Sequence, residues 1–290
     1  ERTMGEKTGI SWTDHTHNFW WGCVRVSEGC VHCYAEAWAE RYQWNVWGVN
    51  ADRRFFDDKH NNEPLNWNKK AQKAGVRRKV FCGSMMDWAE DRPDLIPPRQ
   101  KMFKIIEATP WLDWLLLTKR PENALQMIPQ SWIDTPRPNV WWGTTTENQR
   151  EADRRIPHLL AIPGVVHFLS AEPLLGPVKL PSYTTFAYPD GFENNGPVHT
   201  VLGLGNEPDA QIDWVIAGGE SGAGHRHMDP QWALDLKEQC ANAVGTAFFV
   251  KQMSQDWGPD YKKIEAWPPE FQVQEFPQPH LMRTTLPLGE

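Results

Sequence analysis

Three cysteines lie close together near the start of the chain, in the spacing Cys-x6-Cys-x2-Cys: Cys23, Cys30 and Cys33. Thiolates gathered on one short loop bind metal ions or iron–sulfur clusters. A four-iron cluster held by protein alone takes four thiolates, so three of them leave one iron free for a substrate or cofactor. The spacing therefore predicts either a catalytic [4Fe-4S] cluster or part of a structural zinc site.

The rest of the sequence bears on this choice. A structural zinc site needs a fourth ligand, and three histidines are near enough along the chain to supply it: His15, His17 and His32. No second Cys-x-x-Cys pair follows, because Cys82 and Cys240 stand alone. A thioredoxin-like redox pair would have no use for Cys23. We therefore favour the cluster over zinc, and zinc over simple thiols.

The composition sets the class of protein. A chain of 290 residues is long enough for one large α/β barrel or two medium domains. A formal net charge of -7 argues against a general polyanion-binding surface, although a local basic groove remains open. Five cysteines do not suggest a disulfide framework and fit a reducing compartment. Neither a signal peptide nor an apolar run of about 18 residues is present, so we expect a cytoplasmic protein without a membrane segment.

Short apolar runs of β-forming residues alternate with segments of helical composition. The predicted strands are 19–23, 79–82, 114–118, 140–143, 165–169, 214–217 and 247–250. The predicted helices are 35–42, 98–108, 149–160 and 231–243. This alternation is typical of βαβ units and a parallel sheet, and the run 115–117 of three leucines indicates burial on both faces.

Polar residues follow nearly every predicted strand: Ser84, Asp87, Lys119, Arg120, 144–147, Ser170, Glu172, 218–221, Lys251 and Gln252. In a parallel barrel all these positions gather at one face, where active sites form. We therefore predict an α/β fold, a full or partial (β/α) TIM-like barrel with the cysteine loop after its first strand. An open doubly wound sheet is the alternative.

Two segments interrupt the alternation of strands and helices. Residues 181–211 are rich in Pro, Gly and Asn, which predicts an insertion between two barrel units. Residues 254–290 carry many prolines and aromatic residues without a clear period. We expect residues 1–253 to form the barrel and residues 254–290 to form a tail that packs on it.

Several segments resemble a family of radical S-adenosylmethionine (radical SAM) proteins that is common in phages and bacteria and has long had no assigned function. The first comprises ISWTD at 10–14, Asn18 and the cysteine loop as far as Glu36. Four more follow in order: VFCGSMMD (80–87), LTKRPE (117–122), SAEPL (170–174) and GGESG (218–222). The usual radical SAM motif has three residues between its first two cysteines, whereas this chain has six, and His32 stands where an aromatic residue usually sits.

The resemblance implies that Cys23, Cys30 and Cys33 ligate a [4Fe-4S] cluster and that S-adenosylmethionine chelates the fourth iron. One electron, from a donor such as flavodoxin or ferredoxin, would then cleave the sulfonium. The 5′-deoxyadenosyl radical so formed would abstract a hydrogen atom from the substrate. In such an enzyme the protein orients the cofactor and excludes water.

Residues at the strand ends are assigned to S-adenosylmethionine by their chemistry. The amino group needs acceptors, for which Ser84 and Asp87 are suitable. The carboxylate needs a cation, either Lys119 or Arg120. The ribose hydroxyls need a carboxylate or an amide, for which we expect Glu147 or its neighbour Asn148. Tyr34, which follows the last cysteine, is also expected to contact the cofactor.

The run Gly218-Gly219-Glu220 is similar to one that many radical SAM proteins use to hold the cofactor's amino group. There it follows the second strand, whereas here it follows about the sixth. We therefore expect a substrate or adenine contact. The alternative is a tight turn that requires glycine at positive φ.

The substrate is the least determined part of the prediction. Abundant aromatic residues and strand-end cations favour a nucleobase, nucleotide or DNA strand, with a modified pyrimidine as one example. In that case the enzyme acts in the host cytoplasm if a phage encodes it. Glu172, Lys251 and Gln252 are candidates for substrate contact. The alternatives are a small metabolite or peptide as substrate, or a non-enzymatic zinc module that binds nucleic acid.

Overall fold

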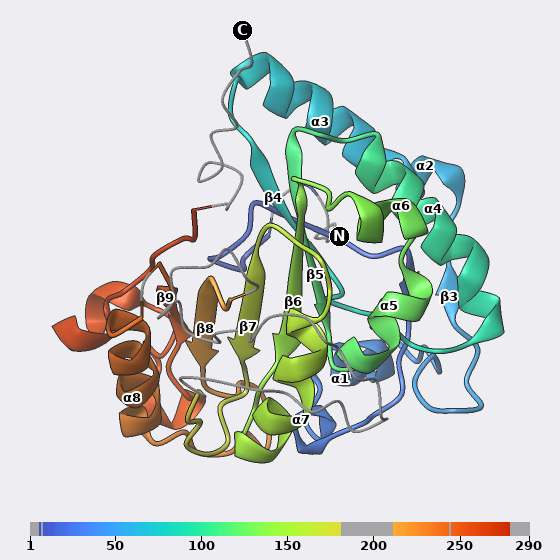
Figure 1. The fold of residues 1–290 in the computed structure, drawn as a ribbon. Coiled ribbons are helices and arrows are strands. Elements are labelled where there is room, and N and C mark those ends of the chain that lie inside the picture. Colours follow the sequence, from blue (N-terminus) through green and yellow to red (C-terminus); the bar gives the residue numbers. More distant parts are fainter. Residues whose placement is uncertain (1–5, 7, 181–210, 244, 279–290) are drawn as a thin grey trace, which may run out of the picture.

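The computed structural model describes residue 6 and residues 8–180, 211–243 and 245–278. Seven strands form one parallel sheet, in which spatial order follows chain order. They are β1 (His15–His17), β4 (Arg78–Cys82), β5 (Leu112–Thr118), β6 (Val140–Thr145), β7 (His167–Ala171), β8 (Trp214–Gly218) and β9 (Ala247–Gln252). The sheet is curled into a half-barrel with β1 and β9 at its edges (Figure 1). The predicted α/β fold, in its partial TIM-like form, is confirmed.

In the described parts of the chain, helices follow β1, β4, β5, β6 and β8, as βαβ units require. They are α4 (Ile96–Glu107) after β4, α5 (Ala124–Met127) and α6 (Gln130–Asp134) after β5, α7 (Gln149–Leu160) after β6, and α8 (Pro230–Ala241) after β8. A longer excursion separates β1 from β4. It contains α1 (Tyr34–Arg41), α2 (Asp58–Asn61), α3 (Glu63–Ala74) and the antiparallel pair of β2 (Trp20–Trp21) with β3 (Arg54–Phe55).

The predicted first strand, 19–23, was wrong. The sheet begins instead with β1, which pairs with β4 through His17 and Cys82, and Trp20 pairs with the small strand β3. Phe19 and Trp20 are fully buried because they pack in the core, so their apolar run reflects burial rather than membership of the main sheet. The amphipathic helix α3 was not predicted, although Gly75 ends it in a left-handed conformation at φ 65°.

Two cores lie on the two faces of the sheet. The outer core packs the helices against the sheet and includes Trp114 and Leu116 of β5. The inner core fills the half-barrel and includes Leu115, the residue between them, as the alternation of a strand requires. Trp12 belongs to the inner core, where its ring lies 4.6 Å from the ring of Phe81 in β4 and 6.2 Å from that of Trp214 in β8. Indole rings therefore bridge the two sides of the curl.

The segment after β9 packs against the barrel. Gln274 forms an antiparallel bridge with Phe249 of β9, and the Phe276 ring contacts the rings of Phe249 and Trp214. Lys79 of β4 places its Nζ 4.3 Å from the centroid of the Phe276 ring. The expected insertion at 181–211, apart from Gln211, and the end of the expected tail, 279–290, lie outside the described residues.

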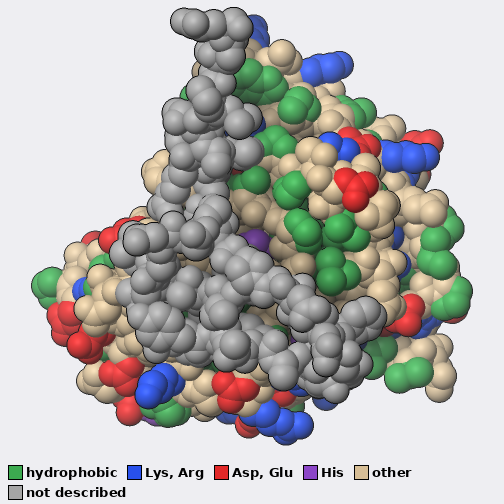
Figure 2. All heavy atoms as spheres, in the orientation of Figure 1, with side chains coloured by type: hydrophobic (Ala, Val, Ile, Leu, Met, Phe, Trp, Pro, Cys, Tyr) green, Lys and Arg blue, Asp and Glu red, His purple; other side chains and the backbone are tan. Residues whose placement is uncertain are grey.

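Charges of both signs are mixed on the surface. On the coloured part of the face in Figure 2, Lys and Arg side chains lie among Asp and Glu side chains. Such mixing agrees with the modest net charge of the chain. Within the described ranges, no helix combines the length and the apolar character that crossing a bilayer would require.

Candidate functional site

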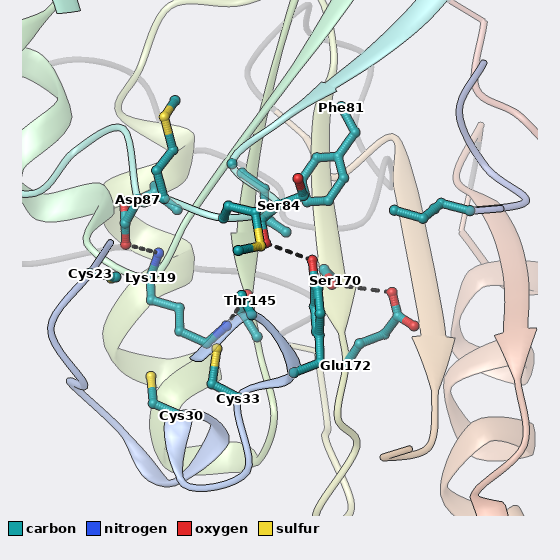
Figure 3. A pocket seen from close by; sticks show the side chains of 18 of the residues that line it. Cys23, Cys30, Cys33, Phe81, Ser84, Asp87, Lys119, Thr145, Ser170 and Glu172 are labelled. Carbon is teal, nitrogen blue, oxygen red and sulfur yellow. Dashed lines mark hydrogen bonds between the residues drawn. The ribbon is translucent and has the colours of Figure 1, made fainter. Parts of the chain in front are cut away.

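The C-terminal ends of the strands enclose a cavity of about 460 Å³, a size typical of small-molecule sites. All three cysteines line it. Four of the other predicted site residues also line it: Tyr34, Ser84, Asp87 and Lys119. So do the three candidates for substrate contact, Glu172, Lys251 and Gln252, whereas five residues predicted to bind the cofactor do not: Arg120, Glu147, Gly218, Gly219 and Glu220. Figure 3 shows Cys23 and Cys30 on one side of the cavity and Glu172 on the other.

The Cys-x-x-Cys pair lies between two helices. Cys30 ends a short 3-10 helix (Glu28–Cys30), and Cys33 is the N-cap of α1, where its carbonyl accepts a hydrogen bond from Ala37 N at 3.0 Å. Burial raises the pKa of the Cys33 thiol, while the amides of Glu36 and Ala35 and the charge of Lys119 oppose that rise. Helix amides and a cation therefore offset part of the effect of burial on the Cys33 thiol.

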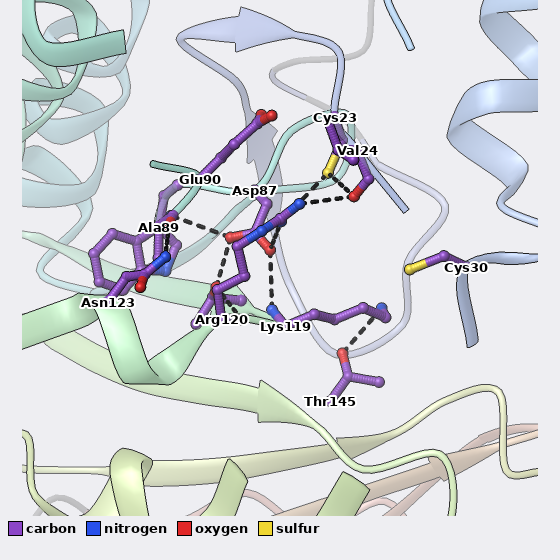
Figure 4. A network of polar contacts seen from close by, with 12 residues as sticks. Cys23, Val24, Cys30, Asp87, Ala89, Glu90, Lys119, Arg120, Asn123 and Thr145 are labelled. Carbon is purple, nitrogen blue, oxygen red and sulfur yellow. Dashed lines mark hydrogen bonds and ion pairs between the residues drawn. The ribbon is translucent and has the colours of Figure 1, made fainter. Parts of the chain in front are cut away.

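Cys23 is held by a buried ion pair (Figure 4). Arg120 Nη1 lies 3.6 Å from Cys23 Sγ and 2.7 Å from Asp87 Oδ2, and Nη2 donates to the Val24 carbonyl at 2.7 Å. Burial raises the pKa of the Cys23 thiol to about 12, against the opposing effect of Arg120. A bound metal would favour the thiolate, because a cation offsets the loss of solvation.

The carboxylate of Asp87 is therefore already engaged. It accepts a hydrogen bond from Thr118 Oγ1 at 2.5 Å as well as the bond from Arg120. Burial works against ionisation, but Arg120 and the hydrogen-bond donors prevail and lower the pKa of Asp87. Its oxygens also accept from the amides of Ala89 and Lys119, so protein donors already occupy both of them although Asp87 lines the cavity.

A second buried carboxylate, Glu147, holds the cysteine loop from the end of β6. Its Oε1 accepts hydrogen bonds from Ser27 Oγ and from Gly29 N, the latter at 3.2 Å. Its Oε2 lies 2.6 Å from Arg155 Nη1, and both side chains are fully buried. Burial opposes ionisation of Glu147, yet the charges of Arg155 and Lys119 lower its pKa. The residue predicted to bind ribose thus contacts the protein's own loop.

A third carboxylate, Glu220, holds the same loop from the end of β8. His32 Nδ1 lies 3.0 Å from Glu220 Oε2, and Arg226 Nη2 lies 2.6 Å from Oε1. Burial would raise the pKa of Glu220, but the hydrogen bonds from Arg226 and His32 lower it to about 2. Glu147 and Glu220 together fix the loop that carries the cysteines.

The two glycines before Glu220 are needed for close approach. Neither Gly218 nor Gly219 has positive φ, so the alternative of a positive-φ turn was wrong. A Cβ on Gly219 would lie 2.3 Å from Ser254 Cα, and a Cβ on Gly218 would lie 2.6 Å from Glu172 Oε1. The backbone of this turn therefore packs directly against its neighbours.

Lys119, Tyr34 and Ser84 remain as polar groups that face the cavity. Lys119 Nζ lies 3.2 Å from Thr145 Oγ1, and the Tyr34 hydroxyl donates to the Ser84 carbonyl at 2.8 Å. Asn18 holds this turn through its side chain, since its amide donates to Ser84 Oγ and its oxygen accepts from Met85 N, both at 2.8 Å. Lys119 is the predicted cation best placed to reach an anionic ligand group.

The donor set fits a thiolate-ligated cluster better than zinc. No group of three Cys, His, Asp or Glu side chains in the described parts of the chain is close enough to hold a metal ion as it stands. The three thiols nevertheless line one cavity, and none of the three candidate histidines lines it. His32 is bonded to Glu220, His15 to the Glu6 carbonyl, and His17 is buried against His60. None of these three histidines is therefore placed to act as the fourth zinc ligand.

Several residues that build the site were not predicted as such. Ser27 acts through a contact with Glu147, 120 residues along the chain, which spacing alone does not reveal. Arg155 and Arg226 instead pair with carboxylates only eight and six residues away, Glu147 and Glu220. One signal did exist for Arg155. It lies on the buried face of α7, four residues after Glu151, and a charged residue on an apolar helix face indicates a buried partner.

Fold and site together define a half-barrel α/β protein with three cysteines around a cavity at the C-terminal ends of its strands. The model of a protein family described as "Protein of unknown function (DUF5131)" matches residues 7–274. The chain therefore belongs to the DUF5131 family. No curated protein and no solved structure matched the chain.

Proposed function

We propose that this protein is a radical SAM enzyme in which Cys23, Cys30 and Cys33 hold a [4Fe-4S] cluster with one open iron. The observation that carries the proposal is that three thiols face one cavity, at the barrel face where chemistry occurs, while the candidate fourth ligands are turned elsewhere. When bound, the cluster and S-adenosylmethionine would supply a 5′-deoxyadenosyl radical that abstracts a substrate hydrogen. The electron would come from a donor such as flavodoxin or ferredoxin.

The residues of the chain have distinct tasks in this proposal. Glu147 and Glu220 hold the cysteine loop, and Arg120 holds Cys23. Lys119 is placed to bind the cofactor's carboxylate, and Ser84 to accept from its amino group, whereas the Asp87 carboxylate is taken up by donors of the protein. The apolar wall formed by Phe81, Leu117 and Met85 would exclude water from the reacting atoms.

The proposed substrate is a nucleobase, a nucleotide or a base within DNA. The wall of the cavity combines aromatic rings with polar groups, which suit the face and the edge of a planar base. The net charge of -7 speaks against tight binding along a duplex, so a single extruded base is the preferred form.

Metal analysis tests the proposal most directly. Anaerobically purified protein should be brown, should contain about four irons and four sulfides per chain, and should release 5′-deoxyadenosine when reduced with S-adenosylmethionine. Cys30→Ala should abolish iron binding, whereas Cys82→Ala should retain it, because Cys82 is buried in β4 away from the cavity. Colourless protein with about one zinc per chain and no 5′-deoxyadenosine would instead support a zinc module that binds nucleic acid.

A further inference from the structure

An ion pair lies on the cavity wall across from Cys23 and Cys30. Lys251 of β9 places its Nζ 3.0 Å from Oε1 of Glu172, which follows β7. Ser170 Oγ lies 3.5 Å from the other carboxylate oxygen, Oε2. All three residues line the cavity, and Figure 3 shows Glu172 on the side opposite Cys23 and Cys30. None of the tasks assigned above to the cysteine loop uses this pair.

The position of the carboxylate is built into the fold. Glu172 is only 10% exposed, and its Oε1 occupies the space that a Cβ on Gly218 would fill. The Gly218 carbonyl accepts a hydrogen bond from Leu174 N at 3.0 Å, which ties the turn after β7 to β8. Lys251 is 27% exposed, and a partly exposed ion pair adds little to stability because desolvation and solvent screening offset its attraction. Its place at the cavity wall is therefore better explained by a ligand than by folding.

The two charged groups specify the kind of ligand edge that fits. An ammonium donor beside a carboxylate acceptor complements a carbonyl oxygen beside an N–H group. That pair is the lactam or imide edge of a planar heterocycle. The face of such a ring needs an apolar surface, and Phe81, Leu117 and Trp12 supply one in the same cavity.

We propose that Lys251 and Glu172 form a subsite for the lactam edge of a planar heterocycle, with Lys251 donating to the carbonyl and Glu172 accepting from the N–H. The inference rests on the proposed function, for which it specifies the substrate class: a base with an N–H next to a C=O, as in the imide of thymine. The rival ligand is an α-amino acid, whose carboxylate would meet Lys251 and whose ammonium would meet Glu172. The apolar wall favours the planar ring, since a small zwitterion has no use for it.

Ligand-observed NMR titration of the anaerobically purified full chain tests the subsite. Thymidine should bind with a measurable Kd. N3-methylthymidine, which lacks the N–H, should bind at least tenfold more weakly, because an unpaired buried carboxylate is costly. Glu172→Gln and Lys251→Met should each weaken thymidine binding at least tenfold. Lys73→Met, on the exposed surface of α3, is the matched control and should not alter the affinity.

The possible results separate clearly. Equal affinity for the two nucleosides, absence of thymidine binding, or binding of glycine in its place would overturn the proposal. Because the two variants change different side chains, misfolding of one leaves the other as a test. The iron content of Glu172→Gln should match that of wild type, and Lys73→Met should match wild type in both iron content and 5′-deoxyadenosine formation. Failure of the subsite is thereby distinguished from failure of the radical chemistry, which the metal analysis decides on its own.

Discussion

Glu147 accepts a hydrogen bond from the amide of Gly29 at 3.2 Å, although 118 residues separate them along the chain. The same carboxylate is anchored 2.6 Å from Arg155 in α7. The cysteine loop is thereby tied to the β6–α7 unit of the barrel through one buried charge. The approach is possible because residue 29 has no side chain: a Cβ there would lie 2.8 Å from Glu147 Oε1.

Gly29→Ala is therefore expected to displace either the carboxylate or the loop. We expect the iron content per chain to fall by at least half and the free energy of unfolding to fall by about 1–3 kcal/mol, the cost of a buried polar group that loses a partner. Iron analysis and urea unfolding measure the two effects. Gly176→Ala is the control, because its Cβ would meet only Asn148 Cβ at 3.8 Å. Full iron loading and unchanged stability in Gly29→Ala would contradict the proposed role of Glu147.

Glu220 predicts an acid-dependent loss of stability. Its pKa falls from an ordinary value of 4.5 to about 2 in the folded protein, because Arg226 and His32 together outweigh burial. A lowered folded-state pKa stabilises the protein fully above about 4.5, and that contribution disappears as the pH falls towards 2. The difference in unfolding free energy between wild type and Glu220→Gln should therefore be largest at pH 7 and shrink between pH ~5 and ~3.

Urea unfolding at several pH values measures this difference. The same Glu220→Gln substitution in an Arg226→Met background is the control, since the main hydrogen-bond donor to Glu220 is then absent. There the substitution should have a much smaller pH-dependent effect. A wild-type-minus-variant difference that is constant from pH 7 to 3 would show that the Glu220 contacts do not stabilise the ionised form.

The ion pair of Arg120 with Asp87 leads us to expect that a second substitution, at Asp87, restores the stability lost in an Arg120 variant. Arg120→Met leaves Asp87 buried without its cation, which should cost about 3–5 kcal/mol of unfolding free energy. Adding Asp87→Asn removes the orphaned charge and should restore most of that stability. Iron content should stay low in both variants, because Cys23 Sγ and the Val24 carbonyl lose their donor in each. Full recovery of iron in the double variant would mean that Arg120 does not position Cys23.

The strands of the sheet were the part of the fold most open to prediction. The predicted strand 214–217 corresponds to β8 (Trp214–Gly218), and 114–118 lies within β5 (Leu112–Thr118). Central strands of a parallel sheet are buried on both faces, so their composition alone marks them. The edge strand β1 has the polar sequence His-Thr-His and only three residues, which gave no such signal. The more apolar residues that follow β1 led to a strand predicted at 19–23, which begins four positions after His15.

The partners of the site residues were harder to predict than their positions. The sequence placed Glu147 and Glu220 at strand ends, and both follow strands in the structure. Their carboxylates nevertheless meet Ser27 and His32 across 120 and 188 residues of chain. Chemistry can assign a carboxylate to a ribose or an amine, but the choice between a ligand and the protein's own loop depends on how the barrel curls. That information is absent from local spacing.

The packing of the inner core leads to one further prediction, which concerns the stability of the fold. Gly143 of β6 packs so closely against Phe168 of β7 that a Cβ would lie 2.2 Å from Phe168 Cζ. Gly143→Ala should therefore overpack the half-barrel and lower the free energy of unfolding by about 1–3 kcal/mol. Phe168→Leu in the same chain should relieve part of this loss, because the shorter side chain leaves room for the new methyl group. Urea unfolding measures both effects, and an alanine variant as stable as wild type would show that β6 and β7 are less tightly packed.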